Sequence, residues 1–324
     1  MKQLIATAVL LLAGAAHAQT PSTGSAPAYP AKPIRMVVPV PPGGIIDVVG
    51  RLLGQKMTEQ TGHTVIIDNR TGGLTSVGSE MVARSPGDGY TLLLQSLPMV
   101  VNPAMLGKMS YDYEKDLAPI SLVVTSPYLL VVHPSVPAKT VRELIAMAKA
   151  QPGKITYSSS GNASNLHVAV ELLAGMAGVK MLHIPYKGGG PALTAVLGGE
   201  ADLSALAVSA VMPHVNAGRM RALAITSSKR LLALPQIASA AEAVPGYEFA
   251  SWVGVLAPAS TPPALVNAVN SVVVKAARAP ELVDRFTKDA TNVVANSPAE
   301  FRAFIQSEAK RWAKVVKDSG MRAD

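Results

Sequence analysis

The sequence lacks cysteine altogether and has few aromatic and few charged residues. Of its 324 residues none is cysteine, 4% are aromatic and 15% are charged, whereas roughly 25% of the residues of an average globular domain are charged. Without cysteine the chain can form no disulfide, no thiolate metal site, no redox pair and no cysteine nucleophile. Its chemistry must therefore come from other side chains and from the backbone.

Positive charge exceeds negative charge, but the excess is dispersed. Lys and Arg total 29 against 21 Asp and Glu, a formal net charge of +8. No basic run is longer than pairs such as Lys229-Arg230 and Lys310-Arg311. The few aromatic residues cannot interleave with these charges as stacking platforms for bases. We therefore expect no nucleic-acid partner and only a mild attraction for anions.

The first 18 residues have the features of an export signal. A short basic segment, Met1-Lys2-Gln3, precedes an apolar stretch over 4–16, and Ala16-His17-Ala18 has the small-x-small pattern of a cleavage site. The alternative is a membrane anchor, but the apolar stretch is shorter than the ~20 residues that span a bilayer. We expect cleavage after Ala18 and an exported protein with a flexible leader over 19–28.

From Tyr29 onward, short apolar β-rich segments alternate with helical patterns. This rhythm is typical of βαβ units and predicts an α/β fold with a parallel sheet, and the chain is long enough for two domains. The predicted strands are 34–40, 64–67, 90–94, 120–132 with an interruption at Ser126-Pro127, 155–158, 180–184, 201–206, 222–226 and 252–256. The predicted helices are 45–61, 144–150, 165–177, 191–197, 211–217 and one starting at Pro298.

Helical spacing also predicts which faces are buried and where helices begin. The first helix should bury Ile45, Val48, Val49, Leu52, Leu53 and Met57 and end at Gly62. Capping boxes at Thr140/Glu143 and Ser297/Glu300 should open two later helices. The last helix should cover a domain with its apolar side and leave its many charges in solvent.

No motif for catalysis is complete. The five histidines after the export signal form no i, i+4 pair, so a helical zinc site is not indicated. The Gly73–Gly78 spacing of a phosphate loop lacks the following lysine. Ser307-x-x-Lys310 matches a penicillin-binding nucleophile pattern, but no Ser-Asp-Asn partner and no Gly-x-Ser-x-Gly elbow exist. We therefore expect neither an enzyme nor a metal or cofactor site.

Two glycine- and serine-rich loops each connect a predicted strand to a predicted helix. The first is Pro41-Pro42-Gly43-Gly44-Ile45-Ile46-Asp47 and the second is the run from Ser158 to Asn165. Glycine lets a ligand approach the backbone, and the N–H groups and positive dipole end of a helix start favour a carboxylate. Either loop alone could be only a tight turn with a cap. Together, at the carboxyl ends of strands in successive α/β units, they favour a shared anion site.

A set of short motifs occurs in order along the chain after the export signal. They are Tyr29-Pro30 through Arg35, Val38-Pro39 through Asp47 with Arg51, Asn69-Arg70, Asp88 through Leu92, Tyr157 through Gly161, Ser164 with His167, Pro185 through Gly188 with Pro191-Ala192, Gly198-Gly199, and Ala257 through Pro262. This ordered set resembles the Bug (TctC) family, the extracytoplasmic receptors of tripartite tricarboxylate transporters.

The resemblance implies a two-lobed periplasmic binding protein of the type II-like, Venus-flytrap kind, with the ligand in the cleft between α/β lobes. We expect lobe 1 to comprise 29–125 and 250–324 and lobe 2 to comprise 126–249, with hinges near Val124–Pro127 and Phe249–Val253. The receptor would be a periplasmic monomer that closes on its ligand. Its partner would be the inner-membrane permease or, alternatively, a sensor domain that reads ligand occupancy.

The resemblance also supplies candidate ligand-binding residues, some acting through bridging water. They are Pro42, Gly43, Gly44, Ile45, Ile46, Asp47, Ser96, Ser160, Gly161, Asn162, Ser164, His167, Tyr186 and Asp202. For His167, a capping or packing role is the alternative.

Departures from the family pattern bear on the ligand. Ile45-Ile46 replaces small or polar residues, Gly72-Gly73-Leu74-Thr75 replaces a Gly-Ala-Gly-Gly stretch, Ala195 replaces an acid, and 203–209 offers only small, apolar or hydroxyl groups. An amino-acid ligand would need a buried acid beside its ammonium group, and Asp47 and Asp202 are the only acids near the loops. We therefore expect a mono- or dicarboxylate with an apolar or aromatic body. A secreted serine hydrolase using Ser160 or Ser307 is the alternative of another class.

Overall fold

The computed structural model describes residues 29–107 and 109–319. The expected export signal and leader lie outside these residues. The strands are β1 (Ile34–Val38), β2 (Val65–Asn69), β3 (Thr91–Ser96), β4 (Leu117–Val132), β5 (Thr156–Ser159), β6 (Leu182–Pro185), β7 (Leu203–Ala207), β8 (Arg221–Ile225), β9 (Ala250–Pro258) and β10 (Asn292–Val293). The helices are α1 (Ile45–Thr61), α2 (Ser76–Ala83), α3 (Pro98–Leu106), α4 (Tyr113–Asp116), α5 (Val141–Ala150), α6 (Asn165–Ala177), α7 (Gly189–Leu197), α8 (Val208–Asn216), α9 (Pro263–Ala277), α10 (Pro280–Lys288) and α11 (Pro298–Ser319).

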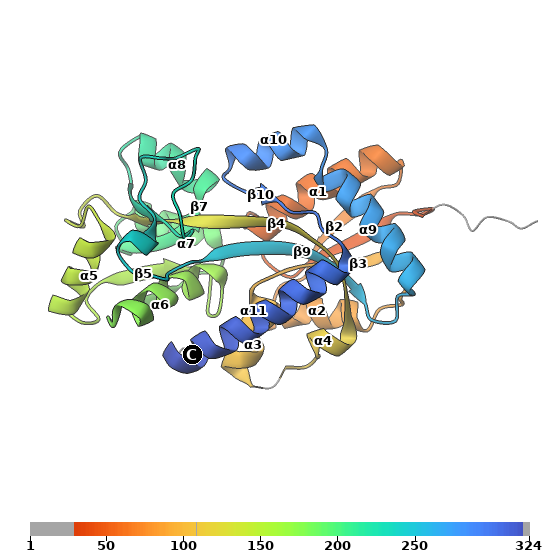
Figure 1. Ribbon diagram of the computed structural model, residues 1–324, viewed down its shortest axis with the longest axis horizontal. Coiled ribbons are helices and arrows are strands. Elements are labelled where there is room, and N and C mark those ends of the chain that lie inside the picture. The colour runs from red at the N-terminus through yellow and green to blue at the C-terminus, as the bar shows by residue number, and fades with distance from the viewer. Residues whose placement is uncertain (1–28, 108, 320–324) are drawn as a thin grey trace, which may run out of the picture.

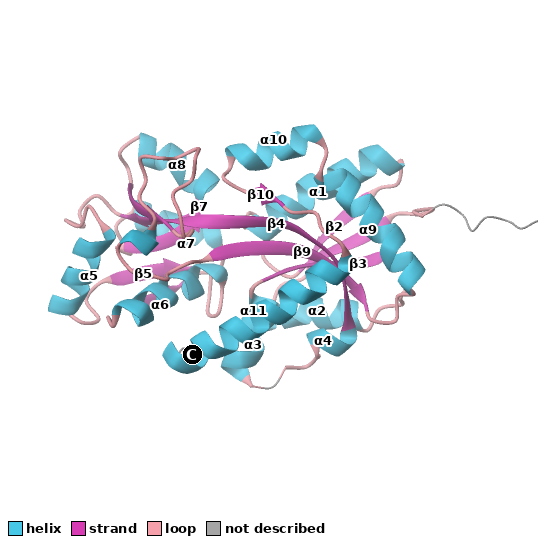
Figure 2. Ribbon diagram, viewed as in Figure 1, coloured by secondary structure: helices cyan, strands magenta, loops and turns pink. Residues whose placement is uncertain are grey.

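The ten strands within the described residues belong to one mixed sheet with helices on both faces (Figure 2). Their order is β2-β1-β3-β9-β4-β7-β5-β6, and β8 and β10 also pair with β4. Strands β1, β2 and β3 are parallel within their group, and so are β5, β6 and β7, as the βαβ rhythm predicts. Strands β4 and β9 run antiparallel to their neighbours. The expected α/β architecture is confirmed.

Strands β4 and β9 run across the middle of the molecule and join its two sides (Figure 1). The first part of β4 pairs with β9 as far as Pro127, opposite Ala250. From Tyr128 onward β4 pairs instead with β7 and β8. Two long strands thus connect the β1–β3 side to the β5–β7 side.

The predicted interruption of this strand at Ser126-Pro127 is wrong, because β4 is continuous over Leu117–Val132. Proline lacks an N–H and is tolerated in a sheet where the ladder is already irregular. Pro127 is the last β4 residue paired with β9, and Tyr128 is the first paired with β7. The missing donor therefore falls where the strand changes partner.

Helix α1 illustrates how the apolar pattern sets the packing. Gly62, with φ 72°, ends the helix in the left-handed conformation, as predicted. The side chains that pack against the sheet are Ile46, Val49, Leu53 and Met57. Val48, predicted to be buried, is 38% exposed. The buried stripe is therefore displaced from the predicted one and includes Ile46 in place of Val48.

Helix α11 begins with the predicted capping box and lies across α3 and β4. The Glu300 N–H donates to Ser297 Oγ at 3.3 Å, and the Ser297 N–H donates to the Glu300 carboxylate at 2.9 Å. The expectation that all its charges face solvent is wrong for Glu308, which is 8% exposed and accepts from Trp312 Nε1 at 3.0 Å. Buried carboxylates of this kind require such a partner.

The sequence pattern predicts no helix for α2, α3, α4, α9 or α10. Valine-rich α9 and proline-containing α3 have weak helical propensity, and packing onto the sheet decides their conformation. Within 29–107 and 109–319, no helix is both long and apolar enough to cross a bilayer.

Candidate functional site

A cavity of about 480 Å³ lies where strand ends meet helix starts. Its walls follow the carboxyl ends of β1, β2, β3, β5, β6 and β7. They also include residues at the starts of six helices: α1, α2, α3, α6, α7 and α8. In an open α/β sheet this edge is where ligands bind, and each helix start directs unpaired N–H groups toward it. The described lining contains no Asp or Glu, and its apolar walls include Ile45, Leu74, Leu166, Leu193 and Leu206.

The first predicted loop leads from β1 into α1 and lines one wall. Gly43 has φ +91°, a conformation that favours glycine, and a Cβ at Gly43 or Gly44 would meet no atom within 4 Å. The N-cap residue Gly44 supplies no side-chain cap to α1. The first N–H groups of α1 are therefore open to a ligand.

Asp47 fixes the shape of this loop from behind, where its side chain is buried. Its carboxylate accepts the Gly43 N–H at 3.0 Å, Arg51 Nε at 2.9 Å and Asn69 Nδ2 at 2.9 Å. Burial alone would raise the pKa of Asp47, but these hydrogen bonds and the Arg51 charge outweigh burial and hold the pKa below its usual value. Asp47 is ionised at neutral pH and is directed to the protein's own donors.

The second predicted loop leads from β5 into α6 and lines the facing wall. Gly161 has φ +121° and Ala163 has φ 54°, so the chain turns sharply here. Ser164 caps α6 by accepting the His167 N–H at 3.4 Å. This cap leaves the N–H groups of Asn165 and Leu166 for other partners.

Two stacked histidines support this loop. The rings of His167 and His183 lie parallel with centroids 4.0 Å apart, and Tyr157 stacks on His183. His167 Nδ1 accepts the Ala163 N–H at 3.0 Å, and His183 Nε2 lies 2.6 Å from Ser159 Oγ. Burial, and secondly the neighbouring His183, lower the pKa of His167 to about 3. His167 is therefore neutral and acts as a hydrogen-bond acceptor that shapes the loop.

A buried cluster of polar side chains at the cavity connects elements from the β1–β3 side and the β5–β7 side of the molecule. Asn165 Nδ2 donates to Ser251 Oγ at 2.8 Å and to Ser96 Oγ at 3.2 Å. Asn165 is the first residue of α6, Ser96 the last of β3, and Ser251 lies in β9. Asn165 Oδ1 is buried and has no hydrogen-bond partner among the residues that the structure describes. Because both partners of the amide are hydroxyls, which donate as well as accept, the amide can present either end to a ligand.

Eight of the fourteen predicted site residues line the cavity: Gly43, Gly44, Ile45, Ile46, Ser160, Gly161, Asn162 and Ser164. The other six, Pro42, Asp47, Ser96, His167, Tyr186 and Asp202, lie outside its lining. Asp47 and His167 support the two loops, and Ser96 contacts Asn165.

The remaining three of these six residues, Asp202, Tyr186 and Pro42, are placed differently. Asp202 accepts the N–H and hydroxyl of Thr156, and the Tyr186 hydroxyl donates to Glu200. Pro42 is exposed. Contact of any of the predicted residues with a ligand stays a prediction.

Several lining residues were missed. The loop Lys187-Gly188-Gly189-Gly190 leads from β6 into α7 and has the same strand–glycine–helix pattern as the two predicted loops, so the same reasoning could have found it. Tyr128 and Asn102 also line the cavity. Tyr128 comes from β4 and Asn102 from α3. The placement of these two elements beside the cavity follows from tertiary packing, which no local pattern in the sequence indicates.

The serines of the hydrolase alternative show no catalytic arrangement. Ser160 lines the cavity, but no histidine and no acid belongs to its described lining. Ser307 and Lys310 are exposed on α11. General-base activation of a serine requires a base within hydrogen-bonding reach.

Comparison with known proteins places the chain among transport receptors. The family described as "Tripartite tricarboxylate transporter family receptor" matches residues 49–321. The chain belongs to this family. The receptor is 36% identical over 299 residues to the protein BugT of Bordetella pertussis, covering 91% of this chain and 92% of BugT. It is a binding protein and no enzyme, which removes the hydrolase alternative.

Solved structures agree with the fold. A structure described as a periplasmic transporter is 33% identical, with a TM-score of 0.85 over 92% of the receptor and 100% of that chain. A protein from R. palustris with adipate is 32% identical, with a TM-score of 0.86 over 91% and 99% of the two chains. MatC from Rhodopseudomonas palustris with bound malate is 28% identical, with a TM-score of 0.83 over 89% and 100%. The expected family and periplasmic-binding-protein fold are confirmed.

Proposed function

We propose that the receptor captures a mono- or dicarboxylate with an apolar or aromatic body and delivers it to an inner-membrane permease. The observation that carries this proposal is the cavity itself: the starts of α1 and α6 face an apolar space whose described lining contains no acidic residue. Helix N-termini stabilise a carboxylate, and the absence of acids avoids repulsion. The similar proteins that hold adipate and malate support the same ligand class.

The apolar walls support a ligand body that is mostly hydrocarbon. Ile45, Ile46, Leu193 and Leu206 offer no hydrogen-bonding side chain. A hydroxyl-rich tricarboxylate would lose its hydration against such walls without compensation. An amino acid would also lack an acid for its ammonium group. Adipate-like or aromatic carboxylates bury apolar surface here, each Å² contributing roughly 25 cal/mol.

Thermal unfolding with a panel of carboxylates tests the proposal. The panel contains adipate, hexanoate, terephthalate, 4-methylbenzoate, glutamate and citrate. A ligand at 100 times its dissociation constant stabilises the folded state by roughly 2.7 kcal/mol, which shifts the melting temperature measurably. Stabilisation by adipate or an aromatic carboxylate is the expected result. Stabilisation by glutamate or citrate alone would exclude the proposed ligand class.

Closure of two lobes is the proposed mechanism of capture. The crossing strands support a division into lobe 1, 29–125 with 250–324, and lobe 2, 126–249. Strands β4 and β9 are the long strands that join the two sides of the molecule. Hinge changes near Val124–Pro127 and Phe249–Val253 would bring the two loops together on the ligand. Small-angle X-ray scattering should show a smaller radius of gyration with a saturating ligand. An unchanged radius would argue against closure.

Export with cleavage after Ala18 completes the proposed route to the periplasm. Mass spectrometry of the protein from a periplasmic extract should give a mature chain beginning at Gln19. A chain that retains Met1 and fractionates with membranes would instead support an N-terminal anchor.

A further inference from the structure

Lys187 is the one charged residue in the described lining of the cavity. It follows β6 and is exposed toward solvent. Within 29–107 and 109–319, no carboxylate lies in ion-pair distance of its ammonium group, whereas Arg51 and Lys56 each have acidic partners. Glu200, which follows α7, accepts a hydrogen bond from the Tyr186 hydroxyl. A cation beside a cavity whose described lining contains no acid is available to a ligand.

The backbone beside Lys187 is also open to an anion. Gly188 is the N-cap of α7, has φ +116° and supplies no side-chain cap. Gly189 and Gly190 are the first two helical residues, and a Cβ at either would meet no atom within 4 Å. Their N–H groups precede the first intrahelical bond, and Pro191, the third residue, has no N–H. This helix start offers two donors and no steric barrier.

The cavity thus offers more hydrogen-bond donors and positive charge than one carboxylate group requires. The starts of α1 and α6 supply one set of donors. The amide of Asn165, which is 6% exposed, adds to this set when its NH2 end faces the cavity, because its two hydroxyl partners can bond to either end of the amide. The start of α7 and the full charge of Lys187 form a second set. Apolar residues such as Leu193 belong to the same lining. A second carboxylate entering this space would lose hydration and would need a counter-charge.

We propose that Lys187, together with the N-terminus of α7, binds a second carboxylate and makes the receptor select dicarboxylates over monocarboxylates of the same length. This inference rests on the proposed carboxylate function and goes beyond it by naming the residue that determines specificity. Gly188 lies close to the first loop, since a Cβ built on it would be 3.9 Å from Pro41 Cβ. Lys187 therefore stands where the β6–α7 loop approaches the β1–α1 loop.

Isothermal titration with two matched ligand pairs tests the proposal. Adipate is compared with hexanoate, and terephthalate with 4-methylbenzoate, since each pair keeps the body and changes one carboxylate. The wild-type receptor should prefer the dicarboxylate of at least one pair by about tenfold or more. Lys187→Met, which keeps an unbranched side chain of nearly the same length, should weaken dicarboxylate binding about tenfold and leave the monocarboxylate within about twofold. Lys187→Arg should retain most of the preference because it keeps the charge.

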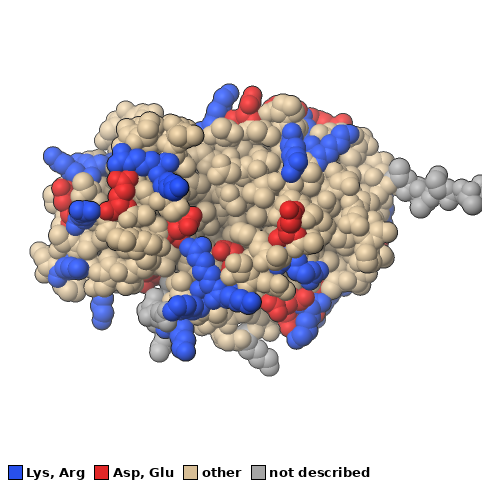
Figure 3. Space-filling model, in the orientation of Figure 1, with Lys and Arg blue, Asp and Glu red and all other residues tan. Residues whose placement is uncertain are grey.

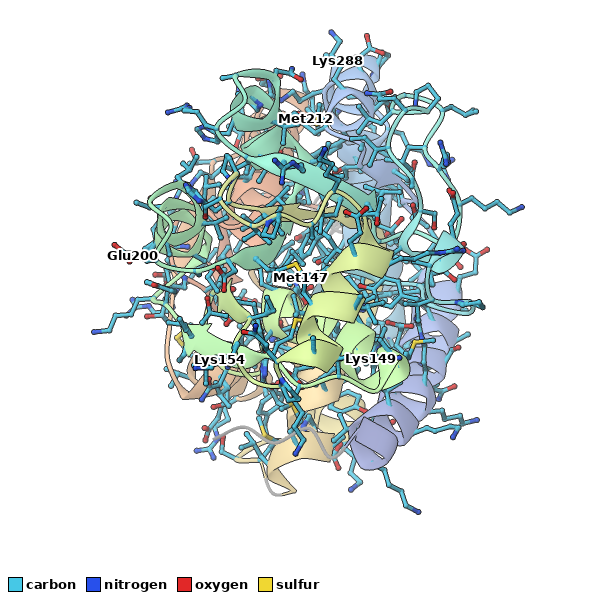
Figure 4. The ribbon with its side chains drawn as sticks, turned by 90° about the vertical axis from the view of Figure 1, so that its left-hand side faces the viewer. Met147, Lys149, Lys154, Glu200, Met212 and Lys288 are labelled. Carbon is cyan, nitrogen blue, oxygen red and sulfur yellow. The ribbon has the colours of Figure 1, made fainter. Side chains whose placement is uncertain are left out.

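The control variant is Lys154→Met, which removes an exposed charge at the end of the molecule that faces the viewer in Figure 4. It should leave both affinities unchanged. A Lys187→Met receptor that loses affinity equally for both members of a pair, or a wild type that binds monocarboxylates as tightly, overturns the specificity role. A wild type that binds none of the four ligands overturns the proposed function itself.

Discussion

The imidazole rings of His167 and His183 stack with their planes within 3° of parallel and their centroids 4.0 Å apart. This geometry is compatible with neutral rings, because two imidazolium ions at this distance would repel each other strongly. His167 Nδ1 also accepts the Ala163 N–H, which a protonated nitrogen could not do. The stack therefore holds the β5–α6 loop only while His167 is uncharged.

Acidification should destabilise the receptor through His167. Its pKa is lowered to about 3 in the folded state, against 6.5 for the free side chain. Between these values the unfolded chain binds a proton that the folded chain does not, so stability rises with pH in this window and falls on acidification. One such proton changes the free energy of unfolding by at most about 1.4 kcal/mol per pH unit.

Urea unfolding of the wild type and of His167→Gln at pH 7.5, 6.0 and 5.0 measures this effect. The variant should lose less stability between pH 6.0 and 5.0 than the wild type. His63→Gln, in the turn before β2, is the matched control and should keep the wild-type slope. Identical slopes for all three proteins would contradict a neutral, buried His167.

Asp47→Asn should destabilise the first loop. The carboxylate accepts from Gly43, Arg51 and Asn69, and hydrogen bonds to a charged group contribute more than neutral ones. We expect a loss of about 2 kcal/mol in the free energy of unfolding at pH 7. The pKa of Asp47 is below its ordinary value of 3.8. Its contribution is therefore complete above pH ~4 and disappears as the pH falls through the folded-state value.

Chemical denaturation of wild type and Asp47→Asn at pH 7 and pH 3 checks this sign. The difference in the free energy of unfolding between the two proteins should be smaller at pH 3 than at pH 7. Arg51→Gln is a useful second variant, because the Arg51 side chain is 53% exposed and its removal leaves the Gly43 and Asn69 bonds in place. Its loss should be smaller than that of Asp47→Asn. A difference that grows on acidification would be inconsistent with a lowered pKa.

The sequence predicted the two loops because their signal is local. A strand, a glycine or serine run and a helix start are adjacent in the chain, and the observed α6 begins and ends at the predicted residues. The supporting contacts are not local: Asn69 reaches Asp47 across 22 positions, and Ser251 reaches Asn165 across 86. The sequence could therefore identify Asp47 and His167 as candidates, with a capping or packing role as the alternative for His167, but it could not show that both lie behind the loops.

The same distinction explains the errors in secondary structure. Pro127 locally disfavours a strand, but the change of partner between β9 and β7 accommodates it.

Surface charge is likewise a property of the folded chain. On the face shown in Figure 3, basic and acidic side chains are interspersed around a broad area without charge, a distribution that the sum of +8 does not describe.

Gly254→Ala should destabilise the packing of α11 on the central strands. A Cβ at Gly254 would lie 2.1 Å from Phe301 Cζ and within 3 Å of two other atoms of that ring, which is fully buried. Overpacking of this kind costs roughly 1–3 kcal/mol. Thermal unfolding should show a lower melting temperature for Gly254→Ala. Adding Phe301→Leu should recover part of the loss, and a double variant no better than the sum of the two single changes would refute the steric cause.

Asn165→Asp should separate ligand binding from folding. A carboxylate at the first residue of α6 is favourable toward the helix dipole, and the hydroxyls of Ser96 and Ser251 can donate to it. We therefore expect the free energy of unfolding to stay within about 1 kcal/mol of the wild type. The same negative charge would face the ligand's carboxylate in the cavity, so the affinity for adipate should fall at least tenfold, roughly 1.4 kcal/mol. Asn216→Asp, at the exposed end of α8, carries the same change in net charge and should leave the affinity unchanged. Calorimetric titration that finds equal affinities for the two variants would show that no ligand carboxylate lies near Asn165, and the anion site would then have to be sought at the start of α7.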